Sequence, residues 1–317
     1  MGHVAPREQR RGMAMRRVGG FGLLLASGLL LLGFGPAREA LAYTAAGDRV
    51  FVATGILPQI APTDQFYTWS WTVPLTSGGI GTPERATNVG AVFEKTITER
   101  LGIHFEDSWF RVDRRGAGSL HGFGNLETEL KYLMVNDHAH EFLLTLGVDR
   151  EWGGTGAAGI GASPKGATTP RVHFGKGLGD LDLGYWRPLA LTGFVGYQAA
   201  DGPPRPDLIT TGFVVEYSIP YLRSKVQSFG LPEVFRGMTP MTEVLFTFPA
   251  GRSFGARTTA LIAPGLNFAG EGWEFVIEAL VPATRATAGG AGVRAQLHLA
   301  LDFLFPDTIG RPLLASR

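Results

Sequence analysis

The chain has 317 residues with 45 glycines and no cysteine, and its 29 Lys and Arg against 28 Asp and Glu give a formal net charge of +1. A nearly neutral chain lacks the basic surface that nucleic-acid binding needs, so we exclude a nucleic-acid partner. The lack of cysteine excludes a disulfide framework. Glycine at about twice its usual share argues against a helical enzyme and suits strand bends and loops.

Residues 1–42 have the three parts of a secretory signal peptide. Arg16 and Arg17 precede an apolar stretch, Phe21 to Phe34, that is shorter than the roughly 20 residues of a transmembrane helix. Ala40-Leu41-Ala42 is the small-x-small pattern that signal peptidase needs, so we predict cleavage after Ala42; the alternative is a retained membrane anchor. Removing this segment removes six Arg and two Glu, which leaves 23 basic and 26 acidic side chains and a net charge near −3.

From residue 65 onward, stretches of alternating apolar and polar residues are separated by turn residues. A period of two is typical of strands with one dry face and one wet face. In 272–282, for example, Trp273, Phe275 and Ile277 alternate with Glu274 and Glu278. The predicted strands are 65–74, 88–97, 101–111, 123–134, 141–150, 169–176, 185–199, 208–218, 241–249, 258–268, 272–282 and 292–305.

The last stretch, 292–305, is the most informative. Every odd position from Val293 to Phe305 is apolar, whereas Arg294, Gln296 and His298 occupy even positions. Outer-membrane barrels have such strands, with the apolar row toward lipid and the polar row toward the lumen. The last strand of a soluble periplasmic all-β binding protein has the same period, but such a protein needs polar outer faces. That protein class stays open as an alternative.

We therefore predict an all-β fold: a transmembrane antiparallel up-and-down β-barrel of about 12 strands over residues 65–305. Residues 43–64 are predicted to be a periplasmic N-terminal segment and residues 306–317 a periplasmic C-terminal tail. With both termini in the periplasm, the turns 98–100, 136–138 and 269–271 share the periplasmic side, and the loops 152–168 and 283–291 lie outside. The long connection 219–240 is then periplasmic, with a short helix from Tyr221 to Phe229.

Aromatic residues near the ends of these strands fit the membrane interface, where amphipathic rings are favoured. They are Trp69, Trp71, Trp109, Tyr132, Tyr185, Trp186, Tyr197 and Trp273.

Polar side chains on the inner faces form the candidate pore lining. Most are carboxylates, and unpaired carboxylates are costly in a dry interior. We therefore predict either a wet, cation-preferring lumen or a barrel plugged by its own ion pairs, with Glu127, Glu129, Glu274 and Glu278 as the main candidates. The full set is Glu94, His104, Glu106, Glu127, Glu129, Lys131, Glu216, Glu243, Glu274, Glu278, Arg294, His298 and Asp302.

Two constellations could suggest a bound ligand. Residues 175–180 read GKGLGD, which is glycine-rich like a phosphate loop but lacks the GxxxxGK[ST] spacing. Asp137, His138, His140 and Glu141 are metal-ligand types, but they fall in one short predicted turn. We predict neither a cofactor nor a metal.

A third constellation could suggest catalysis. His104, Glu106 and Ser108 share a face of one predicted strand, and enzymatic barrels use Ser, His and an acid for lipid acyl chemistry. No GxSxG motif accompanies them. We predict no catalytic residues and no enzymatic activity, and we keep an outer-membrane lipid-modifying enzyme on a barrel scaffold as an alternative.

Several stretches resemble a group of Gram-negative outer-membrane proteins. They are AHEFLL at 139–144, EWGGTG at 151–156, FGKGLGDL at 174–181, RPLALTG at 187–193 and FPDTIGRP at 305–312. This group is similar to the outer-membrane transporter family named after the meta-pathway of phenol degradation, and the resemblance spans roughly residues 85–314. It implies a barrel that moves hydrophobic or aromatic compounds. One departure is that twelve residues follow Phe305, whereas barrels of this class commonly end in Phe.

The sequence thus predicts an exported outer-membrane barrel of a Gram-negative bacterium, porin-like, that gives passage to a small hydrophobic or aromatic solute. Its expected partners are outer-membrane lipid, the barrel assembly machinery and that small-molecule solute.

Overall fold

The structure is a computed structural model that describes residues 44–75, 80–228, 230–232 and 235–314. All of them belong to one compact unit. The predicted signal peptide and its cleavage site lie outside the described residues. No helix in the described ranges is long and apolar enough to cross a membrane.

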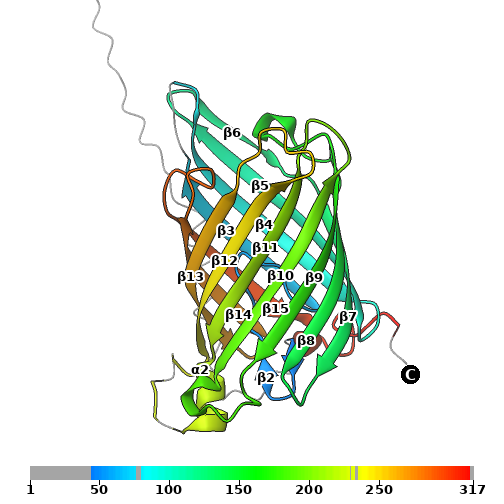
Figure 1. The fold of residues 1–317 in the computed structure, drawn as a ribbon, viewed down its shortest axis with the longest axis vertical. Coiled ribbons are helices and arrows are strands. Elements are labelled where there is room, and N and C mark those ends of the chain that lie inside the picture. The colour runs from blue at the N-terminus through cyan, green and yellow to red at the C-terminus, as the bar shows by residue number, and fades with distance from the viewer. Residues whose placement is uncertain (1–43, 76–79, 229, 233–234, 315–317) are drawn as a thin grey trace, which may run out of the picture. The chain divides into compact units, whose positions relative to one another are not determined.

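The described chain forms an antiparallel sheet that closes on itself (Figure 1). β3 (Gln65–Pro74) pairs with β4 (Pro83–Thr96) on one side and with the last strand, β15 (Gly292–Ala300), on the other. Between them follow β5 (Leu101–Arg114), β6 (Gly118–Phe123), β7 (Glu127–Asp137), β8 (Phe142–Glu151), β9 (Ala167–Gly177), β10 (Leu189–Ala200), β11 (Asp207–Tyr217), β12 (Met238–Ala250), β13 (Thr259–Gly270) and β14 (Trp273–Pro282).

The barrel wall has twelve strands. β6 and β7 both pair with β5 and together make one strand that is interrupted at residues 124–126. Every other strand pairs with its neighbour in the chain. The predicted all-β fold with about twelve antiparallel strands is confirmed.

Several predicted strand ends are wrong. β4 begins at Pro83, five residues before the predicted start at 88, and the predicted strand 123–134 spans the end of β6, the break at 124–126 and part of β7. β10 begins at Leu189 because a 3₁₀ turn, η2 (Gly184–Trp186), occupies the start of the predicted strand. β15 ends at Ala300, where the chain turns into α3 (Leu301–Leu304) instead of continuing to Phe305. In this turn the Leu301 N–H donates to the Asp64 carbonyl, and the Phe305 N–H donates to the Leu301 carbonyl. The apolar alternation of 301–305 therefore does not continue the strand.

The connections divide between two ends of the barrel, as predicted. The lower end in Figure 1 has the connections 97–100, 138–141, 178–188 and 271–272, and the described parts 218–228, 230–232 and 235–237 of the connection between β11 and β12. The upper end has the connections 115–117, 152–166, 201–206, 251–258 and 283–291, and residues 75 and 80–82 between β3 and β4. The long connection at the lower end contains α2 (Ile219–Tyr221) and the π-helical turn η3 (Leu222–Val226), so the short helix there begins earlier than predicted. The Ser218 side chain caps α2 by accepting the Tyr221 N–H.

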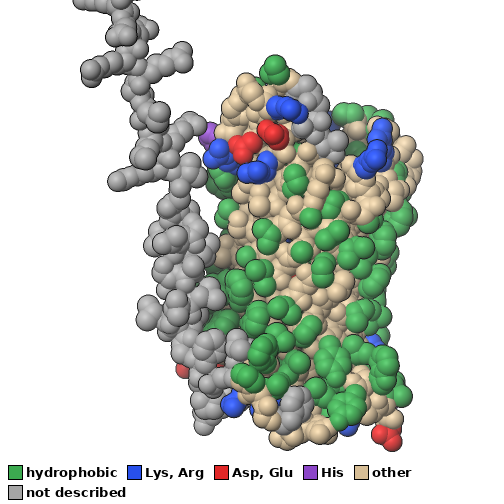
Figure 2. Space-filling model, turned by 90° about the vertical axis from the view of Figure 1, so that its left-hand side faces the viewer, with side chains coloured by type: hydrophobic (Ala, Val, Ile, Leu, Met, Phe, Trp, Pro, Cys, Tyr) green, Lys and Arg blue, Asp and Glu red, His purple; other side chains and the backbone are tan. Residues whose placement is uncertain are grey.

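The outer face of the wall is apolar around the middle of the barrel. Figure 2 shows hydrophobic side chains spread over one side of it, with Lys, Arg, Asp and Glu gathered near the ends. Exposed apolar areas of this size are rare on soluble proteins and are typical of a lipid-facing belt. Exposed members of the belt are Val89, Phe105, Leu130, Leu146, Val148, Val195, Val215, Ile277 and Val293.

Candidate functional site: a plugged lumen

Residues 44–64 lie inside the lower half of the barrel. They begin with a two-stranded hairpin, β1 (Ala45–Ala46) and β2 (Arg49–Val50), which forms its own small sheet. The stretch 51–61 is almost entirely buried, and Phe51 and Leu57 belong to two apolar clusters within the barrel. We call residues 44–64 the plug. This placement corrects the expectation of a separate periplasmic segment, since an apolar stretch such as 51–57 loses more contact with water inside the barrel.

The tip of the plug is held by Glu243 on β12. Its carboxylate accepts hydrogen bonds from three consecutive backbone N–H groups, those of residues 55–57, with distances of 3.0 Å from Ile56 and 2.8 Å from Leu57. A loop brings unpaired backbone donors into the barrel, and each needs an acceptor there. An inward-facing glutamate supplies that acceptor.

Three polar side chains bind the backbone just before the tip. The Ala53 N–H donates to Glu274 at 2.7 Å, and the Ala53 carbonyl accepts from Asn267 at 3.1 Å. Gln296 donates to the Thr54 carbonyl at 2.8 Å. These bonds come from β13, β14 and β15, so one sector of the wall recognises the backbone of the plug.

The returning half of the plug meets the opposite sector of the wall. Lys131 on β7 donates to the Gln59 carbonyl at 3.2 Å and forms an ion pair with Glu94 at 2.7 Å. Glu94 also accepts from Gln65 at 2.8 Å and from Thr63 at 3.3 Å. The Lys131 and Glu94 side chains are both fully buried, and each compensates the charge of the other.

The base of the plug is fixed by a group that we call the clamp: Arg49, Glu141 and Tyr221. The buried Arg49 guanidinium donates to Glu141 at 3.1 Å and lies 4.0 Å above the Tyr221 ring. The Tyr221 hydroxyl donates to Glu141 at 3.0 Å. Burial, together with the neighbouring Glu141 carboxylate, raises the pKa of Tyr221. Arg49 was not predicted from the sequence. The one sequence feature that could have indicated its role is a positive charge next to an apolar stretch.

Three of the family-like stretches meet at this clamp. Glu141 comes from 139–144, Gly179 from 174–181 and Pro188 from 187–193. The Gly179 N–H donates to Glu141 at 2.9 Å, and the Pro188 carbonyl accepts from Arg49 at 3.0 Å. The glycine-rich run that could suggest a phosphate loop therefore binds a carboxylate of its own chain.

The predicted lumen residues lie on the inner face, with one exception. Nine are buried: Glu94, His104, Glu129, Lys131, Glu216, Glu243, Glu274, Glu278 and His298. Glu106, Glu127 and Arg294 are partly buried. Asp302 is the exception, because it lies in α3 beyond the end of the last strand; burial raises its pKa to about 7.

The inner carboxylates form two groups at different heights. In the lower half, Glu216, Glu243, Glu274 and Glu278 surround the plug. In the upper half, Arg171 on β9 forms ion pairs with Glu129 at 3.5 Å and with Asp149 at 3.3 Å. Sequence reasoning missed Arg171 because glycine and proline obscure the period of the predicted strand 169–176. It also missed Asp149, which lies in another predicted strand, 141–150, on the face opposite Leu146 and Val148.

An aromatic row lines the lumen on β3. Tyr67, Trp69 and Trp71 follow one another on its inner face, and Trp71 meets Phe110 of β5 edge-on with ring centroids 6.1 Å apart. The Arg294 guanidinium lies 4.9 Å from the Trp69 ring centroid. Trp69 and Trp71 therefore face the lumen and do not lie at the membrane interface as expected.

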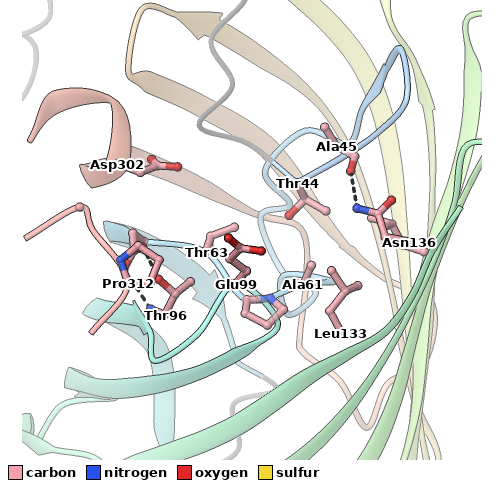
Figure 3. Close-up of a pocket in the computed structure, with 14 residues that line it drawn as sticks. Thr44, Ala45, Ala61, Thr63, Thr96, Glu99, Leu133, Asn136, Asp302 and Pro312 are labelled. Carbon is pink, nitrogen blue, oxygen red and sulfur yellow. Dashed lines mark hydrogen bonds between the residues drawn. The ribbon is translucent and has the colours of Figure 1, made fainter. Parts of the chain in front are cut away.

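A cavity of about 290 Å³ opens at the lower end, between the plug, the wall and the C-terminal tail (Figure 3). The plug contributes Thr44, Ala45 and Thr63, and the tail contributes Asp302 and Pro312. Asn136 of the wall donates to the Ala45 carbonyl across it at 3.3 Å. The volume is at the lower limit for small-molecule sites.

The catalytic and metal constellations do not assemble. His104 and Ser108 are four residues apart on one strand, so about 13 Å separates their Cα atoms, too far for a base and its nucleophile. Instead, Nε2 of His104 lies 3.3 Å from a carboxylate oxygen of Glu106. In the turn 137–141, His140 pairs with Asp137 at 2.8 Å, and no group of metal-ligand side chains occurs among the described residues.

No protein-family model and no curated protein matches the chain. Among solved structures, an outer membrane channel from Pseudomonas putida F1 is 13% identical with a TM-score of 0.50, over 78% of this chain and 99% of that one. The KdgM porin is 9% identical with a TM-score of 0.45, over 74% and 98%. LpxR from Salmonella typhimurium is 12% identical with a TM-score of 0.41, over 74% and 99%. At these identities the likeness concerns the fold: this chain is a closed antiparallel β-barrel similar to those of outer-membrane proteins.

Proposed function

We propose that this protein is an outer-membrane β-barrel that gives passage to a small hydrophobic or aromatic solute when its plug leaves the lumen. The apolar belt supports residence among outer-membrane lipids. In this proposal the chain reaches that membrane after export, through the barrel assembly machinery.

One observation carries the proposal: the plug occupies the lower half of the lumen without belonging to the wall. Among the described residues, its two short strands pair only with each other, and no strand of the wall pairs with them. The polar contacts at its tip are hydrogen bonds between wall side chains and plug backbone, and its apolar side chains pack against the wall. The plug can therefore move while every strand pairing of the barrel stays intact.

The aromatic row supports the choice of solute. Tyr67, Trp69 and Trp71 line one side of the lumen, two of them buried and Trp71 partly exposed. Flat aromatic faces favour aromatic or apolar solutes over sugars through stacking and apolar contact. This chemistry agrees with the compounds that the family resemblance implies.

Fewer carboxylates than the sequence suggested are free to give the lumen a preference for cations. Glu274 and Glu278 lie at the plug, and Glu129 is paired with Arg171. Glu106 on β5 and Glu127 on β7 stay partly exposed on the inner face of the wall. We propose that these two carboxylates give an open barrel its preference for cations.

The test is to release the plug and measure passage. Glu243→Ala combined with Glu274→Ala removes the acceptors at the tip, so conductance in planar bilayers should rise well above that of the parent. Vesicles containing the variant should admit an aromatic solute faster than a sugar of similar mass. Glu84→Ala, at an exposed rim position, is the matched control and should behave like the parent. A folded double variant that passes no solute would refute the proposal.

A further inference from the structure

The apolar belt on the outside of the barrel contains a polar sector on β3 and β5. Side chains of a strand alternate between its faces, so the outward side chains in the middle of β3 are Thr68, Ser70 and Thr72. On β5, Asp107 follows the belt residue Phe105 by two positions and is exposed on the same outer face. We call Thr68, Ser70, Thr72 and Asp107 the polar sector.

The position of Asp107 is unsuited to contact with lipid. It is the seventh of the 14 residues of β5, so it lies near the middle of the wall and not at a rim. Its carboxylate accepts the Ser108 N–H at 2.7 Å and has no ion-pair partner among the described residues. A charged group inside the hydrocarbon layer is costly, and such groups are expected to face protein or water. At the same level across the barrel, the seventh residue of β10 is the exposed Val195.

Within the polar sector, Ser70 is a hydrogen-bond donor at the level of Asp107. The hydroxyls of Thr68 and Thr72 donate to backbone carbonyls of β4 at 2.8 and 3.3 Å. The hydroxyl of Ser70, between them, makes no hydrogen bond with another described residue. Counted from the lower end, Ser70 is the sixth residue of its strand and Asp107 the seventh of its own. The donor and the acceptor therefore lie at nearly the same height, on either side of β4.

This arrangement is complementary to itself under a two-fold rotation. Two copies that enter a membrane from the same side are related by an axis along the membrane normal, and a two-fold interface brings the same patch of both copies together. With the axis beside β4, β5 of one copy faces β3 of the other at the same height. Each Asp107 then meets a Ser70 hydroxyl. Ala91 and Val89, the outward residues of β4 at this level, are small enough for the two walls to approach closely.

We propose that two copies of this protein pack through the outer faces of β3, β4 and β5, with Asp107 of each copy accepting a hydrogen bond from Ser70 of the other. The pairing removes both carboxylates from lipid and leaves the apolar remainder of the belt in contact with it. A hydrogen bond to a charged group is stronger where water is excluded. The inference needs the membrane residence of the proposed function and is independent of solute passage.

Cysteine cross-linking in outer membranes tests the position of the interface. The chain contains no cysteine, so a single introduced one reports without background. Val89→Cys lies beside the proposed axis and should form a disulfide with its counterpart on oxidation, which gives a product of twice the mass of the chain. Val195→Cys on β10 is the matched control, since these two valines are 45% and 49% exposed on opposite sides of the barrel. Equal yields, no dimer from Val89→Cys, or a product of another mass would each overturn the proposal.

A double-mutant cycle tests the Asp107–Ser70 bond itself. Fluorescence energy transfer between labelled copies in lipid vesicles gives the dissociation constant of the dimer. Asp107→Ala and Ser70→Ala should each raise this constant about tenfold or more, because a hydrogen bond to a charged group is lost twice per dimer. The combined variant should be no weaker than the weaker single variant, since both changes remove the same bond. Thr211→Ala, which removes an outward hydroxyl on β11, is the control and should leave the constant unchanged.

The same measurements identify a lipid-facing Asp107. In that case Asp107→Ala would make the barrel more stable in lipid and leave the association of copies unchanged, which overturns the proposal. If Asp107→Ala does not fold, Ser70→Ala tests the bond from its other side. Solute passage is measured separately: a dimer that passes no solute would refute passage alone, and a monomeric barrel that passes solute would refute the interface alone.

Discussion

The lower and upper halves of the lumen contain the same residue types and use them differently. Below, the carboxylates of Glu243 and Glu274 accept N–H groups from the plug backbone. Above, Glu129 and Asp149 pair with Arg171 of the wall, and Glu127 forms no ion pair with a described residue. The role of an inward glutamate therefore depends on what fills the barrel at its height.

The largest effect should come from the clamp at the lower end. Arg49→Ala leaves the buried Glu141 carboxylate without its guanidinium, and breaking a buried ion pair costs about 3–5 kcal/mol. We expect the free energy of unfolding in lipid to fall by that order, and protease to cut the plug faster. Lys225→Ala, which removes an exposed pair with Asp48, is the control and should cost less than about 1 kcal/mol. Equal losses of unfolding free energy in the two variants would show that the clamp stabilises the barrel no more than an exposed ion pair does.

The same substitution in the two halves should give different losses. Glu274→Ala leaves the Ala53 N–H and the Asn267 amide without their shared acceptor, which costs about 1–3 kcal/mol. Glu127→Ala removes a partly exposed side chain and should change stability by no more than about 0.5 kcal/mol. Chemical unfolding of both variants in the same lipid would measure the difference. A larger loss of stability for Glu127→Ala than for Glu274→Ala would contradict the difference between the two halves of the lumen.

Ion selectivity should depend on the two partly exposed carboxylates, Glu106 and Glu127. With the plug released by the Glu243 and Glu274 substitutions, adding Glu106→Gln and Glu127→Gln should shift the reversal potential toward zero. The shift should be larger at low salt, where screening is weak. Asp302→Asn at the lower end, in the same released barrel, should leave the reversal potential unchanged. A shift in that control alone would place the selectivity at the lower end.

A further prediction concerns the pH dependence of stability that Asp302 contributes. Burial raises the pKa of Asp302 to about 7, above the roughly 3.9 of an unfolded chain. Between these values the folded state holds a proton that the unfolded state has lost, so stability falls as pH rises through this window and levels off above it. Asp302→Asn should remove this part of the pH dependence. Unfolding of parent and variant at about pH 5 and about pH 8 compares the two, and parallel profiles would contradict the assignment.

The strands and their faces could be predicted from the sequence because both are local properties. The alternation at Trp273 to Glu278 places glutamates inward whatever the rest of the chain does, since side chains of a strand alternate between its faces. The even number of strands and the sides of the turns follow from connecting such strands in order. The even strand number also supports the prediction of a weakly patterned strand such as 169–176. The inward-facing Arg171 in that strand was not predicted.

The tertiary structure alone decided what fills the barrel. Arg49 and Glu141 are 92 residues apart, and Ala53 and Glu274 are 221 apart, so no period or spacing links them. The end of β15 at Ala300 likewise depends on the Asp64 carbonyl, which takes the Leu301 N–H. The alternation of apolar and polar residues predicts that a glutamate faces inward. The hydrogen-bond partner of that glutamate depends on which distant backbone N–H groups reach it once the barrel has closed.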